Sequence, residues 1–230
     1  MKQAETAVAP RFAAGLGEWA GIVGPIGFVA VFLLEGAVRS DYDPARHFVS
    51  LLALTDRGWV QVANFLIGGA LIAGFGLGLR PAWTGRGRWV PPLIALTGLA
   101  LVWCGVFTSD PALGYPPGTA PGIPTSASLV GGLHYLGAFV VFFGLAVGIF
   151  LSARYGPNRA IRAWAIYSLA SGVVLLGGWI AGFLVVGPSG IVETAGLWQR
   201  IAVVAGWQWL VAVAVLQRST RRAAPPPDGG

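Results

Sequence analysis

The sequence has too little charge for a water-soluble protein of its size. Only 10% of the 230 residues are charged, and 55% are hydrophobic, whereas soluble domains contain about 25% charged residues. The mean hydropathy is +0.70. A bilayer removes the need for a polar outer surface, because hydrocarbon surrounds the protein there. The shortage of charge therefore indicates an integral membrane protein.

Several kinds of functional site are also missing from the sequence. The only cysteine, Cys104, excludes a disulfide within the chain. There is no P-loop, no G-x-S-x-G and no H-E-x-x-H motif, so we predict no metal and no cofactor. The centres of the apolar runs hold almost no ionisable residues, which argues against an ion-coupled pump. The net charge of +6 comes from residues that flank these runs, so we expect no nucleic-acid binding.

Six apolar runs are present instead, each close to the roughly 20 residues with which a helix crosses a bilayer. We therefore predict an all-α fold, a polytopic bundle of six transmembrane helices in one domain over residues 18–217. Residues 1–17 are predicted to be a cytoplasmic segment, and residues 218–230 a disordered cytoplasmic tail. The six predicted spans are 18–38, 59–79, 89–108, 131–152, 162–186 and 197–217.

The distribution of basic residues predicts the orientation. Basic residues concentrate in the cytoplasmic loops of membrane proteins. With the N-terminus inside, all 15 Lys and Arg residues fall on the inner side except Arg39, Arg46, Arg57 and Arg200. We therefore predict a bacterial plasma-membrane protein with both termini in the cytoplasm.

Acidic residues and histidines show the opposite bias and suggest an outward-facing polar pocket. Both histidines and most acids fall at the outer ends of the predicted spans. Our central hypothesis is a pocket roofed by the two longer outer loops, with His134 and Asp110 as candidate catalytic residues. The candidate ligand-binding residues are Glu35, Asp110, His134 and Arg200.

Each candidate residue also has a structural alternative. Asp110 beside His134 suits acid–base or metal chemistry, but Asp110 could cap loop backbone and His134 could bond a neighbouring helix. Arg200 needs an anion inside the membrane. That anion could be Glu35, Asp110 or Glu193, or a lipid phosphate, which a guanidinium fork fits well. Glu35 precedes Arg39 by four residues, the spacing of a local helical ion pair.

The two longer outer loops have distinct compositions. Within residues 39–58, the stretch HFVSLLAL is amphipathic, so we expect a short helix lying along the membrane interface. In the same loop, Asp41, Asp43 and His47 could bind a divalent cation, although their spacing matches no metal motif. Residues 109–131 are rich in proline, which restricts the backbone, so we expect a semi-rigid cap.

Three stretches of the chain carry a family resemblance. They are YDPARHFVSLLAL followed by GWVQVANFLIGG, then GVFTSDPALGYPPGTAPGIPTS followed by GGLHYLGAFVVFF, then GLWQRIAVVAGWQWL. Together they resemble the bacterial six-helix membrane family catalogued as domain of unknown function 998, over residues 20–217. Gln199 stands where some relatives have an acidic residue, so a carboxylate mechanism there is not implied. The family has no assigned reaction, so the resemblance implies the fold and the membrane location only.

Three classes of function are compatible with this sequence. The first is a protein that binds a lipid or amphiphile, or assists a membrane complex, through the outward-facing pocket. The second is a membrane-embedded enzyme on a lipid-linked substrate at the outer leaflet, and the third is a small permease-like transporter. Membrane lipids are the expected partners. Pairs such as Gly17/Gly21 and Gly178/Gly182 have small-xxx-small spacing, which favours close helix packing and allows a homo-oligomer or a membrane partner.

Overall fold

The computed structural model describes residues 2–79, 83–156, 162–184 and 193–223. Within these ranges the secondary structure is helical, apart from an isolated β-bridge between Ala112 and Tyr115. The helices, in chain order, are α1 (Lys2–Val38), η1 (Val49–Ala53), α2 (Gly58–Leu79), η3 (Gly85–Trp89), α3 (Val90–Val106), α4 (Leu129–Phe139), η4 (Val140–Gly144), α5 (Leu145–Tyr155), α6 (Arg162–Leu184) and α7 (Ala195–Ala223).

The prediction of six membrane-spanning helices is confirmed. Six helical stretches of the described residues are long and apolar enough to cross a bilayer. The third joins η3 to α3, and the fourth joins α4, the π-helical turn η4 and α5. The six stretches are Gly17–Val38, Gly58–Leu79, Gly85–Val106, Leu129–Tyr155, Arg162–Leu184 and Ala195–Thr220.

Helical structure extends beyond the predicted spans at both ends of the chain. Helix α1 begins at Lys2, within the predicted N-terminal segment, and α7 continues to Ala223, within the predicted tail. A helix can continue past the bilayer because its backbone hydrogen bonds are internal in water as well as in lipid. Near this end, the Arg218 guanidinium lies 3.9 Å from the centre of the Trp19 ring. Residues 224–230 lie outside the described ranges.

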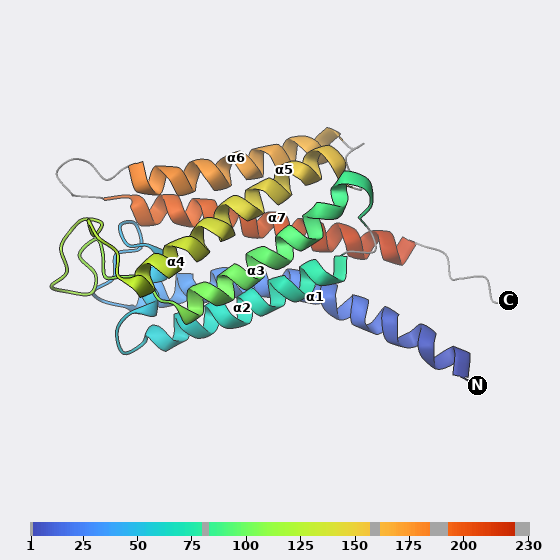
Figure 1. Cartoon of the computed structure of the whole chain (residues 1–230), viewed down its shortest axis with the longest axis horizontal. Helices are drawn as coiled ribbons and strands as arrows, with labels where there is room; N and C mark the ends of the chain where they lie inside the picture. Colours follow the sequence, from blue (N-terminus) through green and yellow to red (C-terminus); the bar gives the residue numbers. More distant parts are fainter. Residues whose placement is uncertain (1, 80–82, 157–161, 185–192, 224–230) are drawn as a thin grey trace.

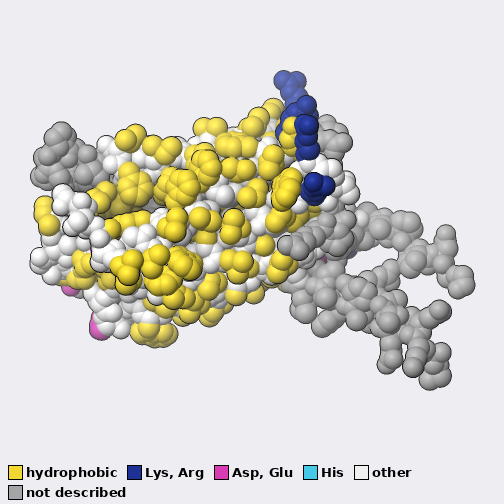
Figure 2. All heavy atoms as spheres, in the orientation of Figure 1, with side chains coloured by type: hydrophobic (Ala, Val, Ile, Leu, Met, Phe, Trp, Pro, Cys, Tyr) yellow, Lys and Arg dark blue, Asp and Glu magenta, His cyan; other side chains and the backbone are white. Residues whose placement is uncertain are grey.

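The bundle has two chemically different ends. Both termini lie at one end, and the loops between α1 and α2 and between α3 and α4 lie at the other (Figure 1). Figure 2 shows hydrophobic side chains over most of the visible face, with Lys and Arg near the end that holds the termini. We call the opposite end, which carries Glu35, Asp41, Asp56 and Asp110, the acidic end. Which end faces the cytoplasm stays a prediction.

Glycine brings α2 and α3 into direct backbone contact. A Cβ atom added at Gly98 would lie 2.3 Å from the backbone nitrogen of Ala73, and one at Gly76 would lie 2.4 Å from that of Ala95. Real Cβ atoms do not approach other atoms so closely, so only glycine fits at these two positions. Close approach of this kind supplies the van der Waals packing that holds membrane helices together.

Candidate functional site

The first loop folds over the start of α7. The first backbone N–H groups of a helix have no partner within the helix. In α7, the N–H of Gly196 donates to the carbonyl of Arg46 at 3.1 Å, and that of Leu197 donates to the carbonyl of Ala45 at 2.8 Å. A Cβ at Gly196 would lie 2.2 Å from the carbonyl oxygen of His47. Glycine therefore lets the loop seat directly on the last helix.

Arg200 is buried beneath this loop. Its Nη1 donates to the carbonyls of His47 at 2.9 Å and Gly196 at 3.0 Å, and its Nη2 donates to the Tyr42 hydroxyl at 2.6 Å. Its guanidinium also lies over the rings of Phe32 and Tyr42. Among the described residues no carboxylate forms an ion pair with Arg200, so its positive charge rests on neutral acceptors.

His47 joins the first loop to the proline-rich loop. Its Nδ1 accepts from the backbone N–H of Asp43 at 2.9 Å, so its Nε2 carries the proton and donates to the carbonyl of Leu113 at 3.1 Å. Burial lowers the pKa of His47 and favours this neutral ring. Both ring nitrogens are engaged by backbone, so His47 has no lone pair free for a cation. Within the described ranges no group of three potential ligands is placed to hold a metal ion.

The rings of Tyr42, His47 and Tyr115 pack together at this junction. The centres of these rings are 5.2 to 5.3 Å apart. Burial raises the pKa of Tyr42 to about 12, so its hydroxyl stays neutral at ordinary pH. Leu113 and Tyr115 of the proline-rich loop are themselves buried, so this loop packs against the first loop, while its expected stiffness stays a prediction.

The amphipathic stretch of the first loop lies inside the bundle, so its predicted interfacial position is wrong. A short helix is present as η1, but all its residues from Val49 to Ala53 are buried. The backbone N–H of Val49 donates to the side-chain oxygen of Gln199 at 2.7 Å. Because Gln199 satisfies a backbone donor that would otherwise need water, the stretch can enter the core. The side-chain amide of Gln199 therefore has a structural partner, the backbone of η1.

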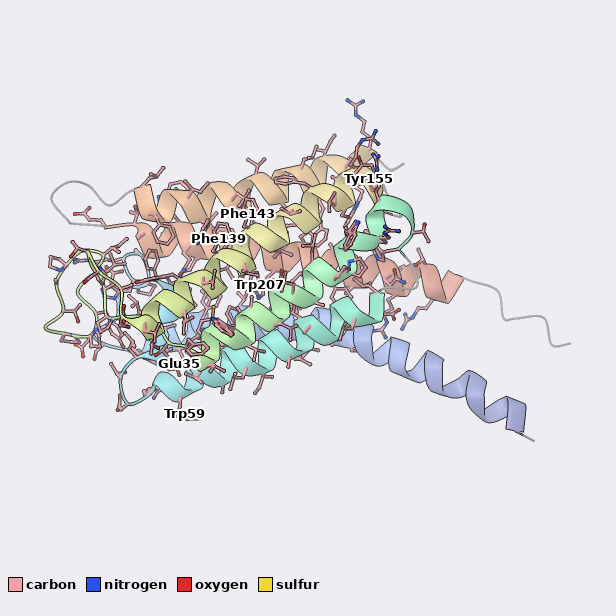
Figure 3. All side chains as sticks on the ribbon, in the orientation of Figure 1. Glu35, Trp59, Phe139, Phe143, Tyr155 and Trp207 are labelled. Carbon is pink, nitrogen blue, oxygen red and sulfur yellow. The ribbon has the colours of Figure 1, made fainter. Side chains whose placement is uncertain are left out.

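Glu35 is held by two arginines. It pairs with Arg39 at 2.9 Å, which confirms the predicted helical pair, and with Arg57 at 2.6 Å from the far end of the loop. Arg39 also donates to the backbone carbonyl of Leu54 and to the hydroxyl of Tyr115. The side chains of Arg39 and Glu35 are 6% and 9% exposed, whereas the Arg57 side chain is 54% exposed. Figure 3 shows Glu35 near the start of α2, marked by Trp59.

Asp110 and His134 make separate backbone-directed contacts. Asp110 accepts from the backbone N–H of Ser128 at 2.8 Å and from its hydroxyl at 2.6 Å, and that hydroxyl accepts from the N–H of Gly131 at the start of α4. His134 directs Nδ1 at the carbonyls of Phe107, at 2.8 Å, and Cys104. These contacts match the structural alternatives raised from the sequence. Asp110 caps loop backbone, and His134 bonds a neighbouring helix.

The four candidates do not form one cluster. No hydrogen bond or ion pair of the described residues joins any two of Glu35, Asp110, His134 and Arg200. Glu35 belongs to the arginine network, Arg200 to the seat of the first loop, and Asp110 to the start of α4. His134 instead lines a cavity of about 40 Å³ inside the bundle, together with Ser50. A water molecule needs about 10–15 Å³, so this cavity has room for a few waters and none for an amphiphile.

A polar groove opens beside the arginine network. It has a volume of about 230 Å³ and is lined by Val38, Arg39, Ser40, Asp41, Thr55, Asp56, Arg57, Tyr115 and Pro117. Sequence reasoning singled out neither Arg57 nor Tyr115 for this position. The sequence signal that could have found them is the charge at both ends of the first loop. Residues 39–41 directly follow α1, and residues 56–57 directly precede α2.

An apolar trough runs between α1 and α2 below this groove. Its upper part, of about 290 Å³, extends from Trp59 and Val31 to Val23 and Leu71. These last two residues also line its lower part, of about 520 Å³, which reaches Gly17. From Gly17 to Val31 the trough follows about 20 Å of helix, more than one leaflet of a hydrocarbon core about 30 Å thick.

Comparison with known proteins agrees with the resemblance seen in the sequence. The family model described as "Protein of unknown function (DUF998)" matches residues 22–216. The chain belongs to this family. Searches of curated proteins and of solved structures found no match. Family membership and the six apolar helices identify a multi-pass DUF998 membrane protein.

Proposed function

We propose that this DUF998 protein binds a membrane amphiphile at its acidic end. The headgroup occupies the polar groove beside Arg57, and a hydrocarbon chain lies in the trough between α1 and α2. The observation that carries the proposal is that a polar groove, lined by the end of α1 and by the first and proline-rich loops, lies next to a long apolar trough between α1 and α2.

The two surfaces are linked along both helices. On α1, Val31 lines the trough and Val38 lines the polar groove. Seven residues make about two helical turns, so the two side chains lie on one face. Leu34 lies between them on that face and is exposed. On the other side, Arg57 lines the groove and Trp59, two residues later, lines the trough, so an amphiphile can contact both at once.

The contacts of the other candidates do not favour the enzyme or the permease. Asp110 is engaged by the start of α4, and His134 uses one ring nitrogen on backbone carbonyls, so Asp110 does not orient His134 as an acid–base pair requires. The central cavity, of about 40 Å³, has room for a few waters only, so it offers no binding space for a larger permease substrate. The proposal therefore places the ligand on the side of the bundle.

A substitution that fills the trough tests this function. Gly27 lines the upper trough, and a Cβ added there meets no atom of the described residues within 4 Å. Gly177 on α6 is equally open but lies away from the trough, so Gly177→Leu is the matched control. Native mass spectrometry of the gently purified protein should show a retained lipid in the wild type and in Gly177→Leu. That lipid should be lost in Gly27→Leu. Equal retention in all three proteins would contradict the proposal.

The predicted orientation assigns this ligand to the outer leaflet. Basic residues cluster at the end that holds the termini (Figure 2), which supports a cytoplasmic location for that end. A cysteine introduced at Ser126 in the proline-rich loop, in a Cys104→Ala background, should react with an impermeant thiol reagent on intact cells. Protection there, with labelling only after lysis, would place the acidic end and the ligand on the cytoplasmic side.

A further inference from the structure

We propose that the headgroup bound in the polar groove is zwitterionic and carries a primary ammonium group, as in phosphatidylethanolamine. The phosphate contacts Arg57, and the ammonium contacts Asp41 and Asp56. This inference rests on the amphiphile binding proposed above and adds the class of ligand. It follows from the charges that line the groove and from which of them remain available.

Arg39 has no capacity left for a ligand. Its Nε and Nη2 donate to the Glu35 carboxylate, Nη2 also donates to the carbonyl of Arg57, and Nη1 donates to the carbonyl of Leu54 and the hydroxyl of Tyr115. Its side chain is only 6% exposed. The charges of Arg39 and Glu35 cancel each other. The charge that a ligand meets in the groove therefore comes from its other charged residues.

Arg57 is the cation available to a phosphate. Its Nη2 and Nε donate to Glu35, at 2.6 and 3.4 Å, while Nη1 has no partner among the described residues. Just over half of its side chain is exposed. A guanidinium presents its N–H donors in a fixed plane that matches phosphate oxygens, and the contact with Glu35 holds this plane in place at the rim of the groove.

Two carboxylates face the same groove. Asp41 and Asp56 are both exposed and line it. One oxygen of Asp56 accepts from the backbone N–H of Arg57 at 2.9 Å, and Asp41 makes no hydrogen bond within the described residues. A purely anionic headgroup would meet both carboxylates, and a purely cationic one would meet Arg57. A headgroup with separate phosphate and ammonium charges satisfies both.

The acceptors also distinguish among zwitterions. A primary ammonium has three N–H donors, which two carboxylates can accept. A trimethylammonium group has none and is commonly bound by a cage of aromatic rings. Among the described residues that line the groove, the one aromatic ring is that of Tyr115, and this ring packs against His47 and Tyr42. The groove therefore favours an ethanolamine headgroup over a choline headgroup.

A competition experiment tests this class of ligand. The full-length protein is equilibrated in detergent with equal amounts of phosphatidylethanolamine, phosphatidylcholine and phosphatidylglycerol that carry identical chains, and bound lipid is measured by native mass spectrometry. We expect the ethanolamine lipid to be enriched roughly two- to fivefold over each competitor, the ratio typical of an exposed ion pair. The double variant Asp41→Asn, Asp56→Asn should lose this enrichment and take up more phosphatidylglycerol.

Two further variants separate the possible failures. Glu193→Gln removes an exposed acid outside the groove and should leave the preference unchanged. Gly27→Leu should remove all retained lipid. If the wild type prefers phosphatidylglycerol or does not discriminate, and Gly27→Leu still loses the lipid, the headgroup inference fails while the proposed function stands. If the wild type retains no lipid, both fail.

Discussion

Replacing Tyr42 by phenylalanine tests how the buried guanidinium of Arg200 is stabilised. The Tyr42 hydroxyl accepts from Nη2 of Arg200 at 2.6 Å and lies 2.9 Å from the carbonyl of Phe48, to which it donates. Burial, opposed by the nearby Arg200 charge, raises the pKa of Tyr42 to about 12, so the neutral hydroxyl can do both. Phenylalanine keeps the ring and its packing and removes these hydrogen bonds.

The expected loss follows from the charge on the donor. A hydrogen bond to a charged group contributes about 1.5–3 kcal/mol, whereas polar contacts inside membrane proteins average about 0.6 kcal/mol. The higher range applies to Tyr42→Phe, because no described carboxylate compensates Arg200 and Nε of Arg200 has no hydrogen-bond partner among the described residues. We therefore expect the folding equilibrium to weaken by about ten- to a hundredfold, since about 1.4 kcal/mol corresponds to a factor of ten.

Tyr115→Phe is the matched control. The Tyr115 hydroxyl also accepts from an arginine, Arg39, at 3.2 Å, but Arg39 keeps its ion pair with Glu35 after the change. We expect a loss below about 1 kcal/mol, as for other polar contacts that leave a charge compensated. Both variants can be compared by reversible unfolding with SDS in mixed micelles, followed by far-UV circular dichroism. A loss for Tyr115→Phe equal to or larger than that for Tyr42→Phe would refute the reasoning.

Three other perturbations have definite expected outcomes. His47 has a pKa below its ordinary value of 6.5 because of burial, so its contribution to stability is present above about pH 6.5. That contribution should fall as the pH decreases, since protonation ends the hydrogen bond from Asp43. His47→Gln should remove this part of the pH dependence of unfolding. Gly98→Ala should lower the melting temperature strongly, because its Cβ would lie 2.3 Å from the backbone nitrogen of Ala73. Gly177→Ala should not, because its Cβ meets no described atom within 4 Å. Asp110→Ala should speed hydrogen exchange at the start of α4, whose first turn it stabilises through two hydrogen bonds; unchanged exchange there would contradict this role.

The sequence was sufficient to predict the spans because membrane helices are specified locally. Each apolar run supplies enough residues to cross the bilayer and satisfies its own backbone hydrogen bonds. The Glu35–Arg39 pair was predictable for the same reason, since four residues make about one helical turn. Contacts that depend only on nearby residues were therefore accessible to sequence reasoning.

The long-range contacts at the acidic end were not predictable in this way. Arg200 was expected to find a carboxylate or a lipid phosphate, yet its described partners are a tyrosine hydroxyl and backbone carbonyls. Every residue has a carbonyl, so no sequence pattern marks those that accept from an arginine. The entry of η1 into the core depends likewise on one amide, Gln199, 150 residues away from Val49. A hydrophobic stretch alone does not show whether it will lie on the membrane or inside the bundle.

The seating of the first loop on α7 makes the order of synthesis matter. The carbonyls of Ala45 and Arg46 accept from the first turn of α7, and the backbone carbonyl of His47 accepts from the Arg200 guanidinium. The ribosome makes these loop residues before it makes α7. Until α7 is made, the backbone N–H of Val49 in η1 lacks its acceptor on Gln199, although η1 can already pack against α1 and α2. The contacts between the first loop and α7 can therefore form only after the sixth span has entered the membrane, so a chain truncated before α7 should expose this loop to proteases.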